Sequence, residues 1–265
     1  MWSLYWRLVG ARIRSQMQYK VSFVLELLGF AVTTGLEFAV VVILFRRFPS
    51  VQGWSVVEVG VLYGLSSIAF GLAEMFGRGF DAPFETMMQR GAFDTVLLRP
   101  LDSFFQVFAS ELQLRRLGRT LQGGLVLAYS FAQLSIQWTA AKLLLLPVTI
   151  ISGTVIFGAL LVMGATLCFW TIKTPEVINA LTFGGQELTS YPLSIYNRSI
   201  RNVFLFVIPL AFVNYPAVLL LLERSDPFGL PAGAAWASPL VAAIFLGIAR
   251  SFWQLGVSKY ASTGS

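Results

Sequence analysis

The apolar residues of this chain are gathered into six long stretches, each bounded by charged residues or by glycine and proline. The stretches lie near residues 21–45, 56–76, 117–136, 143–172, 203–222 and 235–255. A helix that crosses about 30 Å of hydrocarbon needs about 20 mostly apolar residues, and each stretch is about that long. The pattern therefore predicts an all-α integral membrane protein with about six transmembrane helices. Composition does not shift sharply along the chain, so residues 1–265 are expected to form a single domain.

The first 20 residues predict a helix that lies flat in the membrane interface. Trp2, Trp6, Val9 and Ile13 fall on one helical face, while serine, arginine and glutamine residues occupy another. The alternative is a simple basic flank of the first span. A cleavable signal peptide is not expected, because the segment has no continuous apolar core followed by a small-residue cleavage site.

Composition supports the membrane assignment and removes several classes of function. Hydrophobic residues make up 56% of the chain, charged residues only 12%, and the mean hydropathy is +0.72, which exceeds what a soluble domain can bury. Histidine is absent and Cys168 is the single cysteine, which excludes disulfide frameworks, Cys/His metal sites and histidine-based catalysis. No phosphate-binding Gly-x-x-x-x-Gly-Lys-Ser/Thr loop occurs, so we expect neither enzyme activity nor a bound cofactor.

The basic residues give the expected orientation. With the N-terminus in the cytoplasm, all of the 19 lysines and arginines except Arg46, Arg47, Lys142 and Arg224 fall on the cytoplasmic side. This asymmetry is the one that the positive-inside rule requires, and it places both termini in the cytoplasm. It also accounts for the net charge of +6, so nucleic acid is not expected as a partner.

The connection over residues 77–117, between the second and third spans, is far longer than adjacent helices need. It is predicted to lie in the cytoplasm and to contain a short helix. Asp81 is a candidate N-cap, Pro83 suits the first turn, and Gly91 suits the position just after the last turn. Asp102 is a candidate cap for a second amphipathic helix that follows.

The short helix has an apolar face made by Phe84, Met87 and Met88, which follow the i, i+3, i+4 spacing. Such a face on a cytoplasmic helix suits a groove on a soluble partner. The alternative is that this face lies on lipid or packs beneath the helical bundle.

A second long connection, residues 173–202, is also predicted to be cytoplasmic and to lead into the fifth span. That span contains Pro209 and Pro216, with Asn214 between them. We therefore expect its outer half to be kinked or re-entrant, either as a plain structural kink or as part of a pathway.

Four acids lie within or near predicted spans, where a charge is costly. Glu26 and Glu37 are three helical turns apart and so share a face of the first span. Glu58 lies near the outer end of its span and Glu74 near the cytoplasmic end, with water, Arg46 or Arg78 as candidate compensation. Either these acids are structural partners of basic residues, or Glu26 or Glu37 lines a pathway.

Two blocks of the sequence resemble the ABC-2-type transporter permeases. One is Gly91-Ala92-Phe93-Asp94-Thr95-Val96-Leu97-Leu98-Arg99-Pro100-Leu101, which is similar to the Gly-x-Phe-Asp-x-x-Leu-Leu-Arg-Pro-Leu signature of a bacterial branch of the family. The other runs from Tyr191-Pro192 to Tyr215-Pro216-Ala217 and resembles the family's fifth-span region.

The resemblance implies a six-helix permease with an N-terminal interfacial helix and a coupling helix between spans two and three. The implied partners are two copies of a separately encoded ABC-type ATPase, which binds ATP and magnesium, and a second permease as heterodimer or homodimer in the lipid bilayer of a bacterial inner membrane. Export is the commoner direction. The implied docking residues lie within positions 82–101: Phe84, Glu85, Met87, Met88, Arg90, Gly91, Asp94, Arg99 and Pro100. The alternatives are an ion-driven secondary transporter and a membrane scaffold without transport function.

Overall fold

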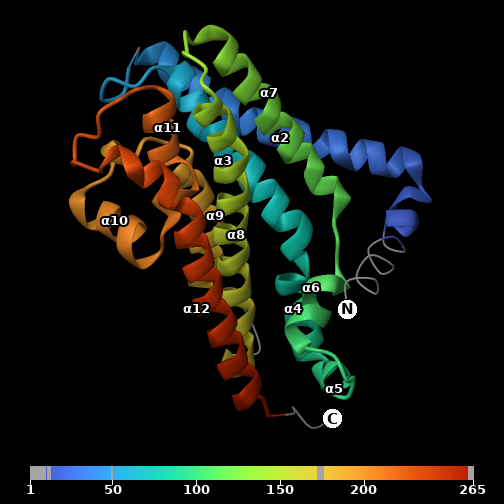
Figure 1. Ribbon diagram of the computed structural model, residues 1–265. Coiled ribbons are helices and arrows are strands. Elements are labelled where there is room, and N and C mark those ends of the chain that lie inside the picture. Colours follow the sequence, from blue (N-terminus) through green and yellow to red (C-terminus); the bar gives the residue numbers. More distant parts are fainter. Residues whose placement is uncertain (1–9, 11–12, 49, 172–175, 262–265) are drawn as a thin grey trace.

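The computed structural model describes residues 10, 13–48, 50–171 and 176–261, and helices dominate this part of the chain (Figure 1). Most of the predicted interfacial helix, residues 1–20, lies outside the described residues. The helices are, in chain order, α2 (Lys20–Arg47), α3 (Val56–Gly77), α4 (Ala82–Gln89), α5 (Phe93–Leu97), α6 (Ser103–Ser110), α7 (Leu117–Gln133), α8 (Ala140–Thr171), α9 (Glu176–Thr189), α10 (Arg198–Asn202), α11 (Tyr215–Leu221) and α12 (Ser238–Lys259).

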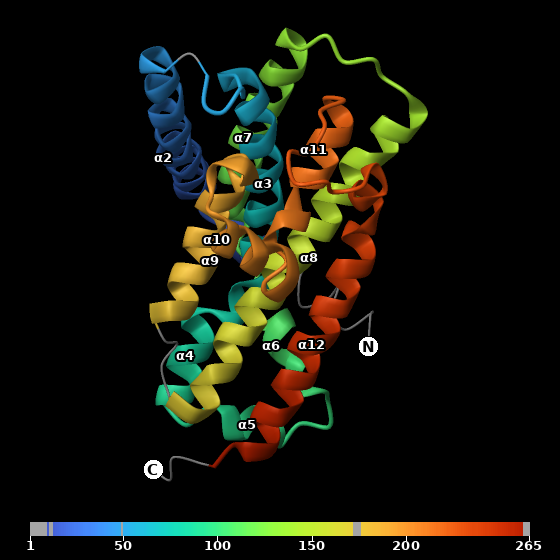
Figure 2. The same cartoon turned by 90° about the vertical axis from the view of Figure 1, so that its left-hand side faces the viewer.

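Four helical stretches of the described chain are long and apolar enough to cross a membrane. They are Lys20–Arg47, Val56–Gln89, Ala140–Thr171 and Gly233–Lys259. Helices of this length and apolar content are those of an all-α integral membrane protein. The end of the bundle that carries α4, α5 and Lys259, at the bottom of Figures 1 and 2, is called the lower end, and the opposite end the upper end.

α7 occupies the range expected for the third span and runs antiparallel to α3. At 17 residues it is about 26 Å long, slightly shorter than the hydrocarbon layer. The two helices approach closely because glycines face each other: a Cβ on Gly64 would lie 2.9 Å from the carbonyl oxygen of Gly123. Small residues at such a crossing let two backbones pack directly, which is how membrane helices associate without a hydrophobic driving force.

α8 and α12 lie side by side and extend beyond the other spans at the lower end (Figure 2). α8 has 32 residues and is therefore about 48 Å long, well beyond the hydrocarbon thickness. Its lower turns are surrounded by the segment that contains α4, α5 and α6. The long connection expected at residues 77–117 is thus a folded layer around the projecting ends of two spans.

The prediction of one fifth span at residues 203–222 is wrong. The chain instead rises through α9, stops near the middle of α3, passes through the short α10, and continues upward in α11 (Figure 2). Pro192, Pro209 and Pro216 each lack a backbone N–H, so they interrupt any continuous helix through this region. The break expected from these prolines is present, but the interrupted crossing begins about 25 residues earlier than the sequence pattern indicated.

The connection expected over residues 173–202 does not lie outside the bundle. Within it, α9 packs against α3 and α8. The guanidinium of Arg201, at the end of α10, lies 3.4 Å from the ring centre of Phe228, in the loop between α11 and α12. Arg198 and Arg201 therefore belong to the upper part of the molecule and not to the side that carries α4.

Candidate functional site

α4 forms as the sequence predicts, and its ends have local causes. Pro83 lies in the first turn, where its missing N–H costs no helical hydrogen bond. Gly91 follows the helix with φ of +65°, a left-handed conformation that glycine adopts without strain. Asp81 makes no capping hydrogen bond and instead pairs with Arg78.

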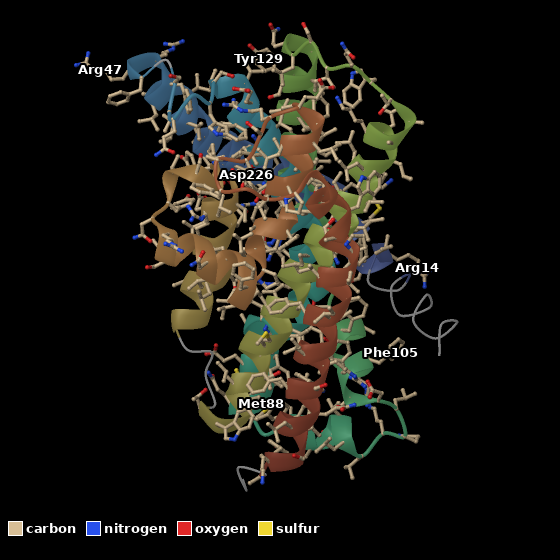
Figure 3. The ribbon with its side chains drawn as sticks, turned by 60° about the vertical axis from the view of Figure 1, so that its left-hand side comes forward. Arg14, Arg47, Met88, Phe105, Tyr129 and Asp226 are labelled. Atoms are coloured by element: carbon tan, nitrogen blue, oxygen red, sulfur yellow. The ribbon has the colours of Figure 1, made fainter. Side chains whose placement is uncertain are left out.

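The expectation that Phe84, Met87 and Met88 are presented to a partner is wrong for this structure. Phe84 is fully buried, Met88 is 2% exposed and Met87 is partly buried. Met88 lies at the lower end, against the ends of the long spans (Figure 3). The physical reason is that α8 and α12 project far enough to offer an aromatic surface, and the apolar face of α4 covers it.

Seven aromatic side chains make this contact, and we call them the lower aromatic cluster: Phe80, Phe84, Phe93, Phe104, Phe169, Trp253 and Tyr260. The ring of Phe84 lies 5.5 Å from that of Phe169 on α8 and 5.1 Å from that of Trp253 on α12, measured between centres. The indole Nε1 of Trp253 donates to Ser103 Oγ at 3.2 Å. The cluster therefore joins α4, α5 and α6 to two membrane-crossing helices.

The opposite side of the same segment is exposed. Thr86, Gln89 and Arg90 are exposed on α4, and Glu85 is partly exposed. Beyond Gly91, the exposed residues are Thr95, Leu97, Leu98, Arg99 and Pro100, whereas Asp94 is partly exposed. Leu98 is 85% exposed and its neighbour Leu97 is 43% exposed, so two adjacent leucines reach the surface here.

Sequence reasoning missed Leu97 and Leu98 as candidate docking residues. Both lie within the signature block, and two adjacent leucines between polar residues were the available signal. Among the residues that it did select, Glu85, Arg90, Arg99 and Pro100 reach the surface, while Phe84 and Met88 lie in the core.

All four acids predicted within or near the spans form ion pairs with basic residues of other segments. Glu74 pairs with Arg116 at 2.9 Å and Glu58 with Arg224 at 2.6 Å, so the nearby Arg78 and Arg46 are not their partners. Glu26 pairs at 3.5 Å with Arg115, in the turn Leu114–Arg116 that precedes α7, and Glu37 pairs at 3.2 Å with Arg119 on α7. The two acids therefore face the same stretch of chain, as their spacing indicates.

Arg119 joins three elements. Its Nη2 donates to Glu37 on α2, and its Nη1 donates to Gln186 Oε1 on α9 at 3.0 Å. The guanidinium also lies 5.3 Å from the ring centre of Phe70 on α3. Glu187, the next residue on α9, is exposed. Acidic groups and one arginine therefore gather on the side of the bundle formed by α2 and α9.

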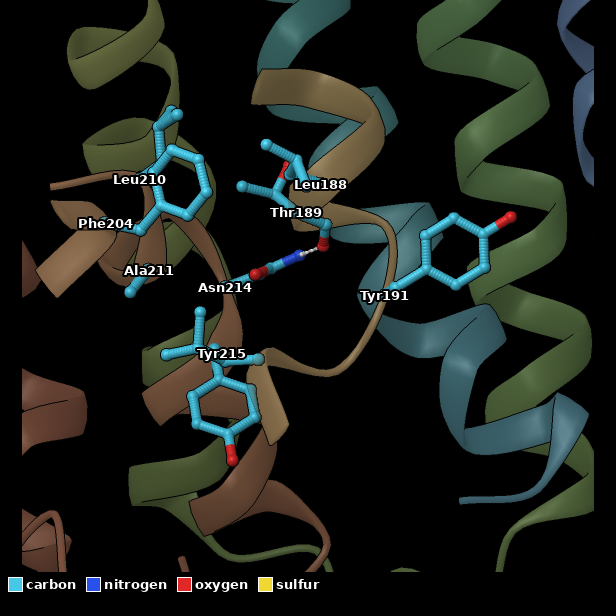
Figure 4. Close-up of a pocket in the computed structure, with 9 residues that line it drawn as sticks. Leu188, Thr189, Tyr191, Phe204, Leu210, Ala211, Asn214 and Tyr215 are labelled. Atoms are coloured by element: carbon cyan, nitrogen blue, oxygen red, sulfur yellow. Dashed lines mark hydrogen bonds between the residues drawn. The ribbon is translucent and has the colours of Figure 1, made fainter. Parts of the chain in front are cut away.

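Asn214 holds the interrupted fifth crossing together. Its Nδ2 donates to the carbonyl oxygens of Thr189 at 2.6 Å, shown in Figure 4, and of Leu62 at 2.8 Å. These bonds satisfy backbone groups where α9 ends and against the middle of α3. The space left beside them is only about 10 Å³, close to the smallest volume that holds a water molecule. Asn214 is thus placed as a structural residue, and no ligand cavity adjoins it.

Comparison with known proteins agrees with this architecture. No curated protein matches the chain. A family model described as "ABC-2 family transporter protein" matches residues 31–264, which is most of the sequence. A membrane component of this family associates with an ABC ATPase subunit and is not itself the ATPase. The chain therefore belongs to the ABC-2 family of transporter proteins and is the membrane component of an ATP-binding cassette transporter.

Proposed function

We propose that this chain is the permease subunit of an ATP-driven exporter of a bacterial plasma membrane, and that α4 and α5 form its coupling segment. One observation carries the proposal: the coupling segment is anchored on its inner side by the lower aromatic cluster and exposes leucine and charged side chains on its outer side. We call the exposed side the docking surface, made by Glu85, Gln89, Arg90, Leu97, Leu98 and Arg99.

Charge distribution supports a cytoplasmic lower end and cytoplasmic termini. Because Arg198 and Arg201 lie in the upper part, the excess of basic residues at the lower end over the upper end is smaller than the sequence predicted, but it is not reversed. Seven basic residues still belong to the lower ends of the spans or to the segments that connect them there. They are Arg78, Arg90, Arg99, Arg115, Arg116, Arg250 and Lys259.

In the proposed mechanism, two ATPase subunits bind ATP and magnesium, and this chain binds no cofactor. Closure of the ATPases moves the docking surface. Because Phe84 and Phe93 pack against Phe169 and Trp253, that movement reaches α8 and α12 without a flexible joint. Residues 82–100 thus convert a change in a soluble partner into a tilt of two spans.

A second permease, identical or related, completes the translocation path in this proposal. The side formed by α2 and α9 supports it, because Glu37 and Glu187 would otherwise be in contact with lipid, where carboxylates are costly. α2 also exposes large apolar side chains along its length, including Leu28, Leu36 and Val40. Contact with a second permease would shelter the acids and leave Glu26 and Glu37 beside the path.

The test is co-purification with the ABC ATPase encoded beside this chain. Leu98→Asp and Arg90→Glu, which alter the docking surface without touching the core, should abolish or strongly reduce the complex. Phe48→Asp is the matched control, because Phe48 is 54% exposed at the upper end and has no role in docking. Undiminished complex formation by both docking variants would refute the assignment.

Orientation has an independent test in cysteine labelling. The native Cys168 is buried, so a new cysteine is the reactive one. A membrane-impermeant maleimide added to intact cells should label Glu223→Cys at the upper end and spare Leu98→Cys until the cells are opened. The reverse pattern would place the coupling segment outside the cell.

A further inference from the structure

An apolar cavity of about 310 Å³ lies between α3, α6, α8 and α12, apart from the coupling segment and from the acids of α2 and α9. Its walls are mainly aromatic and aliphatic. Residues that define its shape are Ala73, Phe76, Phe108, Gly158, Val162 and Leu246.

The cavity lies beside the middle turns of α8. On α8 it extends from Thr154 to Val162, which is about 12 Å along the helix, close to half of the hydrocarbon thickness. Phe76 and Leu246 border it, and each is 37% exposed, so the cavity opens on the side of the bundle. Because α3, α8 and α12 have the length and composition of membrane-crossing helices, we infer that this side faces hydrocarbon. Anything that fills it can arrive from the membrane.

The chemistry of the walls excludes water and polar ligands. Thr154 is the one lining residue with a hydroxyl, and that hydroxyl already donates to the carbonyl oxygen of Ile150 at 2.8 Å. A water molecule needs two to four polar partners to remain in a cavity, and these walls offer at most the acceptor of the Thr154 hydroxyl. At about 30 Å³ for a water-sized group, the volume suits about ten methylene groups, which is most of one acyl chain.

A cation marks the lower edge. Arg250 lies one helical turn below Leu246, and its guanidinium is 4.5 Å from the ring centre of the lining residue Phe104. One edge of the guanidinium binds Asp102, and its Nη1 is buried without a hydrogen-bond partner among the described residues. The side chain as a whole is 32% exposed. The exposed part of Arg250 therefore offers a positive charge to a phosphate at the membrane surface.

We propose that this cavity holds one acyl chain of an anionic glycerophospholipid, with its phosphate beside Arg250. The lipid comes from the leaflet on the side of α4. It acts as a fixed wedge between α3 and the pair α8 and α12, filling a space that the protein's own side chains leave empty. Phe80 and Phe104 of the lower aromatic cluster form part of the cavity wall, but the site does not depend on the assignment of the docking surface.

A substitution at Gly158 that fills the cavity tests whether a lipid chain binds there. A side chain added at Gly158 meets no atom within 4 Å of its Cβ, so Gly158→Leu projects into the cavity without displacing the core. Gly124 on α7 also has nothing within 4 Å of its Cβ and does not line the cavity. Gly124→Leu is therefore the matched control for the change in helix propensity and in surface hydrophobicity.

The full chain is reconstituted in vesicles of phosphatidylglycerol and phosphatidylethanolamine, extracted in mild detergent, washed, and weighed by native mass spectrometry. The wild type and Gly124→Leu should retain one phospholipid, enriched in phosphatidylglycerol. Gly158→Leu should retain about tenfold less. Equal retention by the two leucine variants would overturn the proposal, and retention of detergent alone by the wild type would also overturn it.

Headgroup recognition is tested separately. Arg250→Gln should abolish the enrichment of phosphatidylglycerol over phosphatidylethanolamine, whereas Asp102→Asn, which keeps the cation and removes its partner, should preserve it. An unchanged enrichment in Arg250→Gln would refute the role of Arg250. If Gly158→Leu does not yield a monodisperse protein, Leu246→Trp closes the opening from its exposed rim and should lower retention in the same way.

Discussion

The ring of Phe84 packs edge-on against that of Phe169, at 5.5 Å between centres and an interplanar angle of 71°. One belongs to the coupling segment and the other to the projecting end of the longest membrane helix. Edge-to-face pairs at this distance are favourable and directional. The contact therefore fixes the orientation of α4 on α8 and distinguishes the part of the segment that anchors from the part that is free to dock.

Phe84→Ala should lower stability and leave docking intact. The variant removes a fully buried ring from the lower aromatic cluster, which we expect to cost about 3 kcal/mol. Thermal unfolding in detergent measures the loss, and ATPase co-purification measures docking. Leu98→Ala, at an exposed position, should leave stability unchanged and weaken docking of the ATPase. A wild-type midpoint for Phe84→Ala would contradict the burial of this ring.

Arg119→Gln should destabilise the protein by about 3 kcal/mol or more, because it leaves the Glu37 carboxylate without its basic partner at membrane depth. Adding Glu37→Gln should restore part of that loss, since two amides can still form a hydrogen bond. A double-mutant cycle from thermal unfolding gives the coupling. Arg115→Gln is the comparison: its pair with Glu26 is long and exposed, so a change of about 0 to 1 kcal/mol is expected.

Asn214→Asp should be nearly as damaging as Asn214→Leu. A carboxyl group donates no hydrogen bond when ionised and one at most when neutral, so neither variant can donate to both carbonyl oxygens of Leu62 and Thr189, at a cost of about 1 to 3 kcal/mol. Hydrogen exchange of the amides around residues 186–190 should rise in both. Asn202→Leu, at an exposed position of the same region, should show no such rise.

Asp102 should give the protein a small acid-dependent loss of stability. Burial tends to raise the pKa of this carboxyl, but the hydrogen bond from Arg250 and those from the backbone N–H groups of Phe105 and Phe104 outweigh it, so the pKa is lowered. A carboxyl with a lowered pKa contributes stability above its unfolded pKa of about 3.9 and loses it as pH falls through the folded value.

Because Asp102 is 41% exposed, screening limits this contribution to about 0 to 1 kcal/mol. Unfolding curves of the wild type and Asp102→Asn should therefore differ at pH 6 and converge below about pH 4. A constant difference across that range would show that the ion pair with Arg250 does not form.

The elements that the sequence predicts well are those whose signal is local. The apolar stretches at α2, α3, α8 and α12 are continuous and long, and α4 is bracketed by Pro83 and Gly91. Asp102 caps α6 as expected, accepting from the N–H of Phe105 at 2.9 Å. In each case the residues that determine the element lie within it or beside it.

The features that could not be predicted depend on contacts between distant segments. The sequence pattern of Phe84 and Met88 is the same whether their face contacts a partner protein or packs against α8. They pack against α8 because α8 projects beyond the other spans at the lower end. Asn214 replaces helical hydrogen bonds with bonds to Leu62 and Thr189, which no local pattern reveals. The ion pair between Glu58 and Arg224 also joins distant segments and is not signalled by any local pattern.

The length of α8 below Pro147 has a mechanical consequence. From Thr171 to Gly153 the helix is about 27 Å long, so a turn of about 5° at its lower end shifts Gly153 by about 2 Å. Near its upper half, Gly153 lies directly against Val213, so close that an added Cβ would be 3.1 Å from a Val213 methyl group. A small rotation of the lower end of α8 therefore becomes an ångström-scale displacement of the interrupted crossing. The helices can remain folded while this displacement takes place.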